Sequence, residues 1–551
     1  MRLDVNKSPQ WLLYGMLMLA LVFMALPVSA LLIRSLADGS GQWVGFQNFQ
    51  LWINTPSLVD SALRSLKLSA ISALICTLLA YAYAYALNLS CMPWKRFFKG
   101  VALLPLLAPS LLMAIGMVYL FGNQGLLKNY FPGSLYGELG ILLGSVFWTF
   151  PHALLVLLIS LKTIDAQLIE SAKVLGASPW RIFYTVILPN TRYGLIMSLT
   201  IVFILVLTDF SVAKVLGGSA NVLATDIYKQ VIGQQNFAMG AVVSLVLLIP
   251  ALFAYVIEKR ASRNQAAMLG TRSVVYRASP SLQRDGLLTL FCTVMALLIV
   301  CVIGTAIFAS VATYWPYRLA PTLKNYDFTH TLSAGWSVYF NSVKLAVCVA
   351  FLGATLSFFT AWLVEKIPAH PKSRSLMNFF AMLPMAVPGL CLGLGYVLFF
   401  NHPQLQFMHL YGTMSILVIC TVVHFYSVAH ITFVSSLKQL DKEFEAVSQS
   451  LGVNAWTTLW RVHLPVCLPA ILEVAAYLMI NAMTTVSAVV FLYAPSTELA
   501  SVAVLNMDDA GDVAPAAAMA VMIFLTAAAM QLIVFAAQYC VKKHTQAWRT
   551  R

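Results

Sequence analysis

The chain has 551 residues, of which 60% are hydrophobic and 10% are charged, and its mean hydropathy is +0.82. Soluble globular domains carry roughly 25% charged residues, so this composition excludes an ordinary soluble protein and places most of the chain in lipid. The formal net charge is +14, but the basic residues lie in short segments between apolar runs, which indicates membrane orientation rather than nucleic-acid binding.

Apolar runs of about 18 or more residues recur along the whole chain, and in hydrocarbon such a run satisfies its backbone polar groups only as a helix. We therefore predict an all-α integral membrane protein with about twelve transmembrane helices. The first run, residues 11–33, is longer than the apolar part of a secretory signal, so we expect a retained helix. The twelve centres lie near Val22, Cys76, Ala114, Leu154, Ile204, Leu247, Ile299, Ala350, Gly393, Thr421, Leu478 and Phe524.

The loops between these runs differ in charge. Most of the 34 Lys and Arg residues fall in alternate loops, on the side that also holds the N-terminus. Cytoplasmic loops carry such an excess, so both termini are predicted to be cytoplasmic.

Four segments of the first half recur in the second half in the same order. The offset between the copies stays between 276 and 279 residues, which predicts a duplication. Six spans per copy give both copies the same orientation, with a transport pathway between them. The matched segments are residues 63–68 with 340–345, 104–109 with 383–388, 175–189 with 451–465, and 208–211 with 484–487. The predicted organisation is a first half at residues 1–260, a cytoplasmic linker at 261–285 and a second half at 286–551.

The sequence contains no phosphate-binding loop, zinc-protease motif or serine-nucleophile turn. The nine cysteines form no CxxC pair, and His424 and His430 lack the spacing of metal ligands. We therefore predict that the chain is no enzyme and holds no metal or cofactor of its own.

Two predicted cytoplasmic loops, residues 165–192 and 441–468, share one pattern. In the first, Glu170 and Ala172 precede Gly176, and Leu188-Pro189 follows. A glycine with positive φ ends a helix, so we expect a short helix, a turn and a second helix that stops at the proline. The second loop has Glu445, Ala446, Gly452, Leu464 and Pro465 in the corresponding segment. A single loop of this kind is more often a solvated connection, whereas two matched copies favour docking on a partner.

This pattern resembles the EAA loops of ABC-importer permeases, in which a Glu-Ala-Ala segment precedes a Gly and a later Leu-Pro. The second copy departs from it, because Ala446 stands where the acid is expected and Glu445 lies one position earlier. The resemblance implies a type I importer permease in a bacterial inner membrane. It also implies that both loops seat in an ATP-binding cassette ATPase dimer, which uses ATP and Mg, and that a substrate-binding protein delivers the solute.

Fusion of both halves in one chain resembles the branch that imports ferric iron, thiamine or 2-aminoethylphosphonate. Residues 487–493 and 505–512 look most like the 2-aminoethylphosphonate permeases. The alternatives are the same architecture importing ferric iron or thiamine, and an ion-gradient-driven carrier, which would need an ion site that the spans do not display.

Two further groups of residues occupy matched places. Polar side chains near the ends of the fifth and eleventh spans would line a pathway or form ordinary interhelical hydrogen bonds: Thr208, Asp209, Ser211, Thr484, Thr485 and Ser487. Prolines in the third and ninth spans would kink their helices, either as a gate or as a static bend: Pro105, Pro109, Pro384 and Pro388.

Overall fold

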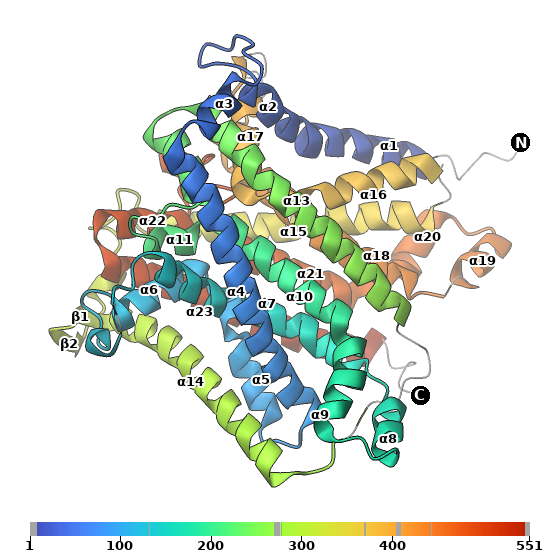
Figure 1. Cartoon of the computed structure of the whole chain (residues 1–551). Helices are drawn as coiled ribbons and strands as arrows, with labels where there is room; N and C mark the ends of the chain where they lie inside the picture. Colours follow the sequence, from blue (N-terminus) through green and yellow to red (C-terminus); the bar gives the residue numbers. More distant parts are fainter. Residues whose placement is uncertain are drawn as a thin grey trace, which may run out of the picture.

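The computed structural model describes residues 8–131, 133–268, 276, 278–367, 371–403, 409–441 and 443–545. In this part of the chain, long helices form a bundle with one two-stranded antiparallel hairpin at its edge (Figure 1). The short helices α8, α9, α19 and α20 lie at one end of the bundle, at the right in Figure 1. We call this end the EAA face, and the end that carries the β-hairpin, α11 and α22 the opposite face.

In the described part of the first half there are thirteen α-helices and several short π and 3-10 turns. Its helices are α1 (Ser8–Ala20), α2 (Leu26–Ser35), α3 (Gln47–Ile53), α4 (Pro56–Leu89), α5 (Lys95–Leu103), α6 (Ser110–Phe121), α7 (Glu138–Lys162), α8 (Ala166–Val174), α9 (Pro179–Ile182), α10 (Leu188–Thr208), α11 (Ser211–Leu216), α12 (Leu223–Tyr228) and α13 (Phe237–Met268). Its short turns are η1 (Leu21–Ala25), η2 (Leu104–Leu107), η3 (Lys128–Tyr130), η4 (Phe183–Ile187) and η5 (Lys229–Gly233).

The second half repeats the order of the long helices and adds the β-hairpin. Its helices are α14 (Leu282–Val311), α15 (Ser337–Lys366), α16 (Pro371–Ala386), α17 (Gly389–Phe400), α18 (Met414–Lys438), α19 (Glu443–Ser450), α20 (Ala455–Thr458), α21 (Leu464–Thr484), α22 (Ala500–Ala510) and α23 (Val513–Thr545). Its remaining elements are β1 (Ala312–Tyr314), β2 (Arg318–Pro321), η6 (Lys324–Tyr326), η8 (Leu459–His463) and η9 (Pro495–Thr497).

Among the described residues, ten helices are long and apolar enough to cross a membrane, and two bent helix pairs bring the total to as many as twelve. The predicted all-α membrane fold is confirmed. The predicted third and ninth spans are not single helices: Lys95–Leu107 meets Ser110–Phe121 at 104°, and Pro371–Ala386 meets Gly389–Phe400 at 111°. Proline disfavours helical geometry in the residue before it, and Ala108 before Pro109 is accordingly extended, with ψ 139°.

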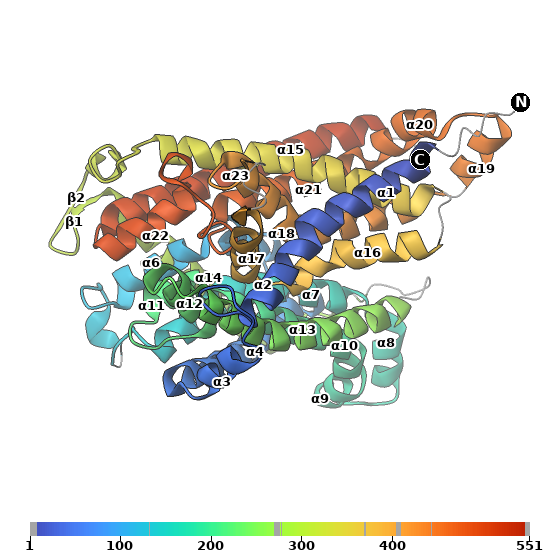
Figure 2. The same ribbon diagram turned by 90° about the horizontal axis from the view of Figure 1, so that it is seen from above.

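The halves exchange their first spans. Helix α2 packs on α17 of the second half, whereas α14 packs on α6 of the first half. Figure 2 shows α1 crossing over the yellow and orange helices of the second half. Glycines allow both crossings, because a Cβ on Gly116 would lie 2.5 Å from the Val302 carbonyl oxygen and one on Gly395 would lie 2.5 Å from that of Pro27. Small residues at a helix crossing let backbones approach closely.

A matched hydrogen bond explains one of the repeated sequence segments. Ser65 Oγ accepts from the backbone N–H of Leu223 at 2.8 Å, and Ser342 Oγ accepts from that of Ala500 at 2.7 Å. Both serines are buried and both donors begin a short helix near the opposite face. The duplication therefore extends to individual buried contacts.

Candidate coupling loops and translocation pathway

The first EAA loop folds into the predicted helix and turn. Asp165 begins α8, and its carboxylate accepts from the backbone N–H of Gln167 at 3.1 Å. At the other end, Gly176 has φ +73°, and the N–H of Ala177 donates to the carbonyl of Ala172 at 3.0 Å. This closure needs a residue in the left-handed region, which explains the glycine.

The second EAA loop has the same turn. Gly452 has φ +66°, and the N–H of Val453 donates to the carbonyl of Ser448 at 2.8 Å. Asn454 then begins α20, with its side chain accepting from the N–H of Trp456 at 3.3 Å. Both loops are therefore helix–turn–helix units on the EAA face.

Neither loop stops at its Leu-Pro pair, so that prediction is wrong. Helix α9 continues through η4 into α10, and α20 continues through η8 into α21, as helices of 30 residues each. A π-helical turn stands directly before Leu188-Pro189 and before Leu464-Pro465. The wider turn changes the hydrogen-bond ladder at the point where proline lacks its N–H, so the helix passes through.

Large apolar side chains are exposed at the tips of both loops. Val174 and Leu175 are 87% and 85% exposed in the first loop, and Leu451 is 72% exposed in the second. Trp180 and Trp460 are also exposed. Exposed apolar groups clustered on one face are typical of a surface that binds another protein.

The two acids of the EAA loops lie differently. Glu170 is exposed on α8 and points away from the core of the first half. Glu445 is half-buried, with its carboxylate 2.5 Å from Lys366 Nζ, and Ala446 is exposed beside it. Of the remaining predicted positions, Ala172, Leu188, Leu464 and Pro465 are half-buried and Pro189 is exposed.

The four predicted prolines lie at breaks between helices. Pro105 belongs to η2 and Pro384 to the last turn of α16, while Pro109 and Pro388 directly precede α6 and α17. At the second break, Ser427 Oγ accepts from the N–H of Met385 at 3.1 Å and donates to the Ala381 carbonyl at 2.7 Å. A neighbouring helix thus satisfies backbone groups at the bend, which favours the static interpretation of these prolines.

The predicted pathway residues mostly bond their own backbone. Thr208 and Thr484 end α10 and α21, and each donates to a carbonyl one turn back, at 2.9 and 3.1 Å. Asp209 accepts from the N–H of Val212 at 2.8 Å and so begins α11. Ser211 and Thr485 are buried, and Ser487 is half-buried. These contacts favour a structural role for the threonines.

Asp209 nevertheless lines a small pocket of mixed polar and apolar lining in the first half. Ser65, Ser69 and Ser145 share its wall, and its volume is about 10 Å³. This is close to the smallest space that holds one water molecule.

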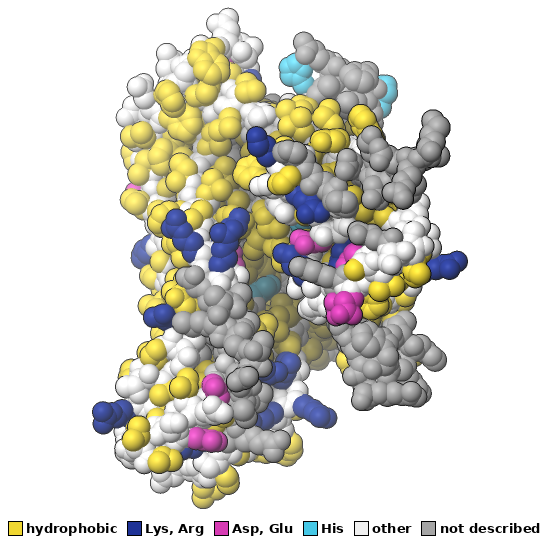
Figure 3. Space-filling model, turned by 90° about the vertical axis from the view of Figure 1, so that its right-hand side faces the viewer, with side chains coloured by type: hydrophobic (Ala, Val, Ile, Leu, Met, Phe, Trp, Pro, Cys, Tyr) yellow, Lys and Arg dark blue, Asp and Glu magenta, His cyan; other side chains and the backbone are white. Residues whose placement is uncertain are grey.

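The halves meet at the opposite face through charged and aromatic side chains. Lys214 Nζ of α11 lies 3.0 Å from Asp509 of α22 and 5.4 Å from the ring centroid of Tyr228. Tyr228 in turn stacks on Phe491 of the second half, with ring centroids 6.3 Å apart. The EAA face, in contrast, is hollowed between the two halves, with hydrophobic side chains in the walls (Figure 3).

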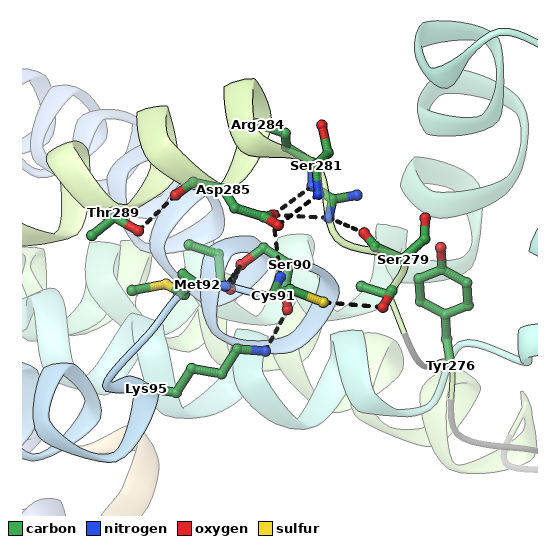
Figure 4. Close-up of polar contacts among 12 residues, drawn as sticks. Ser90, Cys91, Met92, Lys95, Tyr276, Ser279, Ser281, Arg284, Asp285 and Thr289 are labelled. Atoms are coloured by element: carbon green, nitrogen blue, oxygen red, sulfur yellow. Dashed lines mark hydrogen bonds and ion pairs between the residues drawn. The ribbon is translucent and has the colours of Figure 1, made fainter.

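The described part of the linker contacts the first half (Figure 4). Asp285, in the first turn of α14, accepts from the N–H of Cys91 at 3.2 Å, and Cys91 Sγ donates to the Ala278 carbonyl at 3.0 Å. Tyr276 lies 2.8 Å from Lys173 Nζ of α8. Helix α13 extends to Met268 and α14 begins at Leu282, while residues 269–275 and 277 lie outside the described part.

Comparison with known proteins decides the family. Residues 92–263 and 353–539 both match the model described as "Binding-protein-dependent transport system inner membrane component", and the two matches cover more than half of the chain. The chain belongs to this family. It is the permease subunit of an ABC importer, a multi-pass inner-membrane protein rather than an enzyme, and the match in each half confirms the internal repeat.

Relatives of this permease include two long matches and one shorter one. The "Ferric transport system permease protein FbpB" of Actinobacillus pleuropneumoniae is 29% identical over 91% of this chain and 74% of that protein. A "Putative ferric transport system permease protein FbpB 1" of Haemophilus influenzae is 28% identical over 90% of this chain and 80% of that one. The "Putative 2-aminoethylphosphonate transport system permease protein PhnU" of Salmonella choleraesuis is 23% identical over 48% of this chain and 94% of that one.

Sequence reasoning did not predict several side-chain contacts that connect the parts of this permease. Lys214 and Asp509 join the halves at the opposite face, and Lys366 and His463 flank Glu445. A signal was available for Lys214, since it is the single charged residue of α11. Nothing in the sequence marked Asp509 as its partner, because they lie almost 300 residues apart.

Proposed function

We propose that this permease forms the membrane pathway of an ATP-driven importer of ferric iron. The observation that supports ferric iron as the substrate is the similarity to two ferric transport permeases over about nine-tenths of the chain. The 2-aminoethylphosphonate relative matches only 48% of the chain. Ferric iron is therefore better supported than 2-aminoethylphosphonate, which the sequence had favoured.

In this proposal the EAA face is cytoplasmic. Basic residues of that end include Lys95, Lys99, Lys173 and Arg181, as the positive-inside bias requires. Both termini are then cytoplasmic, an ATP-binding cassette ATPase dimer binds the two EAA loops, and a substrate-binding protein docks on the opposite face. The hollow seen in Figure 3 then opens to the cytoplasm, which corresponds to an inward-facing state.

Each EAA loop is continuous with a helix that leads to the closed end. In the first half, Pro179–Thr208 is one helix of 30 residues, and Asp209 links it to α11, which carries Lys214. In the second half, Ala455–Thr484 leads to the segment that carries Phe491. A displacement of the loops by the ATPase would therefore reach the contacts that close the opposite face.

Binding of ATP shifts the equilibrium only through contacts that differ between the two states. The apolar tips at Val174, Leu175 and Leu451 supply one set of such contacts, and the closure at Lys214 and Asp509 supplies the other. The proposed cycle closes the ATPase on ATP, separates the opposite face, admits ferric iron and then resets.

Uptake measurements with three alternative solutes test which substrate the permease transports. Proteoliposomes that hold the permease with its ATPase and substrate-binding protein would be given ATP and radiolabelled ferric iron, thiamine or 2-aminoethylphosphonate. We expect ferric iron alone to accumulate, and excess unlabelled ferric complex to suppress the signal. Accumulation of thiamine or 2-aminoethylphosphonate instead would leave the function as an importer permease intact and would refute ferric iron as its substrate.

A further inference from the structure

The two EAA loops are attached to the membrane helices by different chemistry. In the second half, Glu445 Oε1 lies 2.5 Å from Lys366 Nζ and 3.4 Å from His463 Nε2. The side chains of Lys366 and His463 are only 8% and 3% exposed. We call Lys366, Glu445 and His463 the ionic joint.

The joint connects three elements at their ends. Lys366 is the last residue of α15, Glu445 lies in the first turn of α19, and His463 is the last residue of η8. A cation at a helix C-terminus and an anion at a helix N-terminus both interact favourably with the helix dipole. Trp362 Nε1 donates to His463 Nδ1 at 3.1 Å, which leaves the proton of a neutral imidazole on Nε2, toward Glu445.

The first half has apolar residues at all three matched positions. Leu89 ends α4 as Lys366 ends α15, Ile187 ends η4 as His463 ends η8, and Ile169 stands in α8 where Glu445 stands in α19. These three residues are buried in the hydrophobic core. The offsets, 277 for the first pair and 276 for the others, agree with those of the repeat.

A matched tryptophan also differs between the loops. Trp456 of α20 packs on Trp362 of α15, with ring centroids 5.4 Å apart, and on Phe359 at 5.8 Å. Its counterpart Trp180 is 72% exposed. The second loop is therefore held against α15 by a tryptophan as well as by the ionic joint.

Separating the partners of a buried ion pair leaves each charge uncompensated, so any movement of α19 away from α15 that breaks the contact between Glu445 and Lys366 is costly. We propose that Glu445 is a positioning residue, which fixes the second coupling helix to α15 through Lys366 and His463, and that exposed Ala446 occupies the ATPase-facing place that Glu170 has in the first loop. This inference rests on the proposed docking of the ATPase at the EAA loops. It assigns the second acid to the permease itself rather than to the ATPase interface.

Charge exchange tests the positioning role in the complete importer. Lys366→Glu and Glu445→Lys alone should each lower substrate transported per ATP hydrolysed at least fivefold. The double exchange should recover half or more of the wild-type ratio. Glu170→Lys, at the exposed acid of the first loop, is the matched control, and no substitution at position 366 should rescue it.

Replacement by the residues of the first half provides a second test. The triple variant Lys366→Leu, Glu445→Ile and His463→Ile reproduces the apolar set of the other loop. It should insert into the membrane and unfold at a temperature near that of the wild type. It should also transport more substrate per ATP hydrolysed than Lys366→Leu alone. Coupling equal to that of the single variant would contradict the positioning role.

Photo-crosslinking separates the two faces of α19. With p-benzoylphenylalanine at position 446 we expect a crosslink to the ATPase, and with the same group at position 445 we expect none. If the wild type takes up substrate with ATP, strong crosslinks from position 445 or a wild-type transport ratio in Glu445→Lys would overturn the positioning role of Glu445. Absence of ATP-dependent uptake by the wild type would instead refute the proposed function.

Discussion

Asp508, at the opposite face, is a single residue whose protonation should affect closure. Burial is the main cause that raises the pKa of this carboxyl to about 6, with the neighbouring Asp509 adding to it and Lys214 opposing it. In an open state that hydrates the carboxyl, its pKa would return toward the ordinary value. Protonation therefore stabilises the closed state below about pH 6, and this stabilisation is lost as the pH rises through 6.

The pH dependence leads to a prediction. Lowering the pH from 7 to 5 should shift the ATP-induced opening toward the closed state by up to roughly tenfold, the upper limit for one carboxyl whose pKa is about 6 in the closed state and near its ordinary value in the open state. Spin labels at Ser219 and Ser496, exposed residues of the two halves, would report the distance. Asp508→Asn should abolish most of this shift, and a pH dependence equal to that of the wild type would contradict the assignment.

At the scale of elements, the exchanged first spans depend on two glycines. Gly116→Ala should place a Cβ 2.5 Å from the Val302 carbonyl oxygen and force α6 and α14 apart. Overpacking of this kind costs about 1–3 kcal/mol, so the Tm of the purified permease should fall by several degrees. Gly395→Ala should act in the same way on α17 and α2.

Gly304→Ala is the matched control for these variants. Gly304 also lies in α14, but nothing is within 4 Å of a Cβ built on it. Its Tm should remain unchanged or rise, because alanine favours helix over glycine. Equal losses at positions 116 and 304 would show that close approach is not the cause.

The turns of the EAA loops give a further prediction. Gly176 and Gly452 have φ of +73° and +66°, whereas proline fixes φ near −65°. Gly176→Pro or Gly452→Pro should therefore displace a coupling helix and abolish ATP-dependent uptake, with the permease still inserted. Pulldown of the ATPase should weaken in parallel, and unaltered ATPase binding would contradict this role of the turns.

Element type was more predictable from the sequence than side-chain direction. Hydropathy and repetition were sufficient for the spans, and Gly176 and Gly452 for the turns. The sharp breaks at Pro109 and Pro388 could not be predicted from the sequence, because a proline is compatible with either a kinked helix or the start of a new helix. The direction of Glu445 was also hidden, since one position along a helix rotates a side chain by about 100°, and only packing against Lys366 shows which face it occupies.

At the scale of the whole molecule, the permease is hollowed between its halves at the EAA face (Figure 3). Among the described residues, the ion pair between Lys214 and Asp509 joins the two halves at the opposite face. Such a partly exposed pair contributes roughly 0–1 kcal/mol. The aromatic contact between Tyr228 and Phe491 adds to it.

Charge reversal at this pair should change the balance between states. Lys214→Asp should favour opening and raise ATP hydrolysis in the absence of the binding protein about twofold to fivefold. Lys214→Asp with Asp509→Lys should restore the wild-type rate. A double variant no better than the single one would show that this pair does not stabilise the closed end.

The energy source of transport most directly tests whether the EAA loops couple this permease to an ATPase. Ferric iron uptake would be measured in proteoliposomes that hold the permease, its ATPase and its binding protein, with ATP alone or with a proton gradient alone. We predict uptake with ATP alone, lost in the Gly176→Pro, Gly452→Pro double variant. Uptake that follows the proton gradient without any ATPase would contradict an importer coupled through the EAA loops.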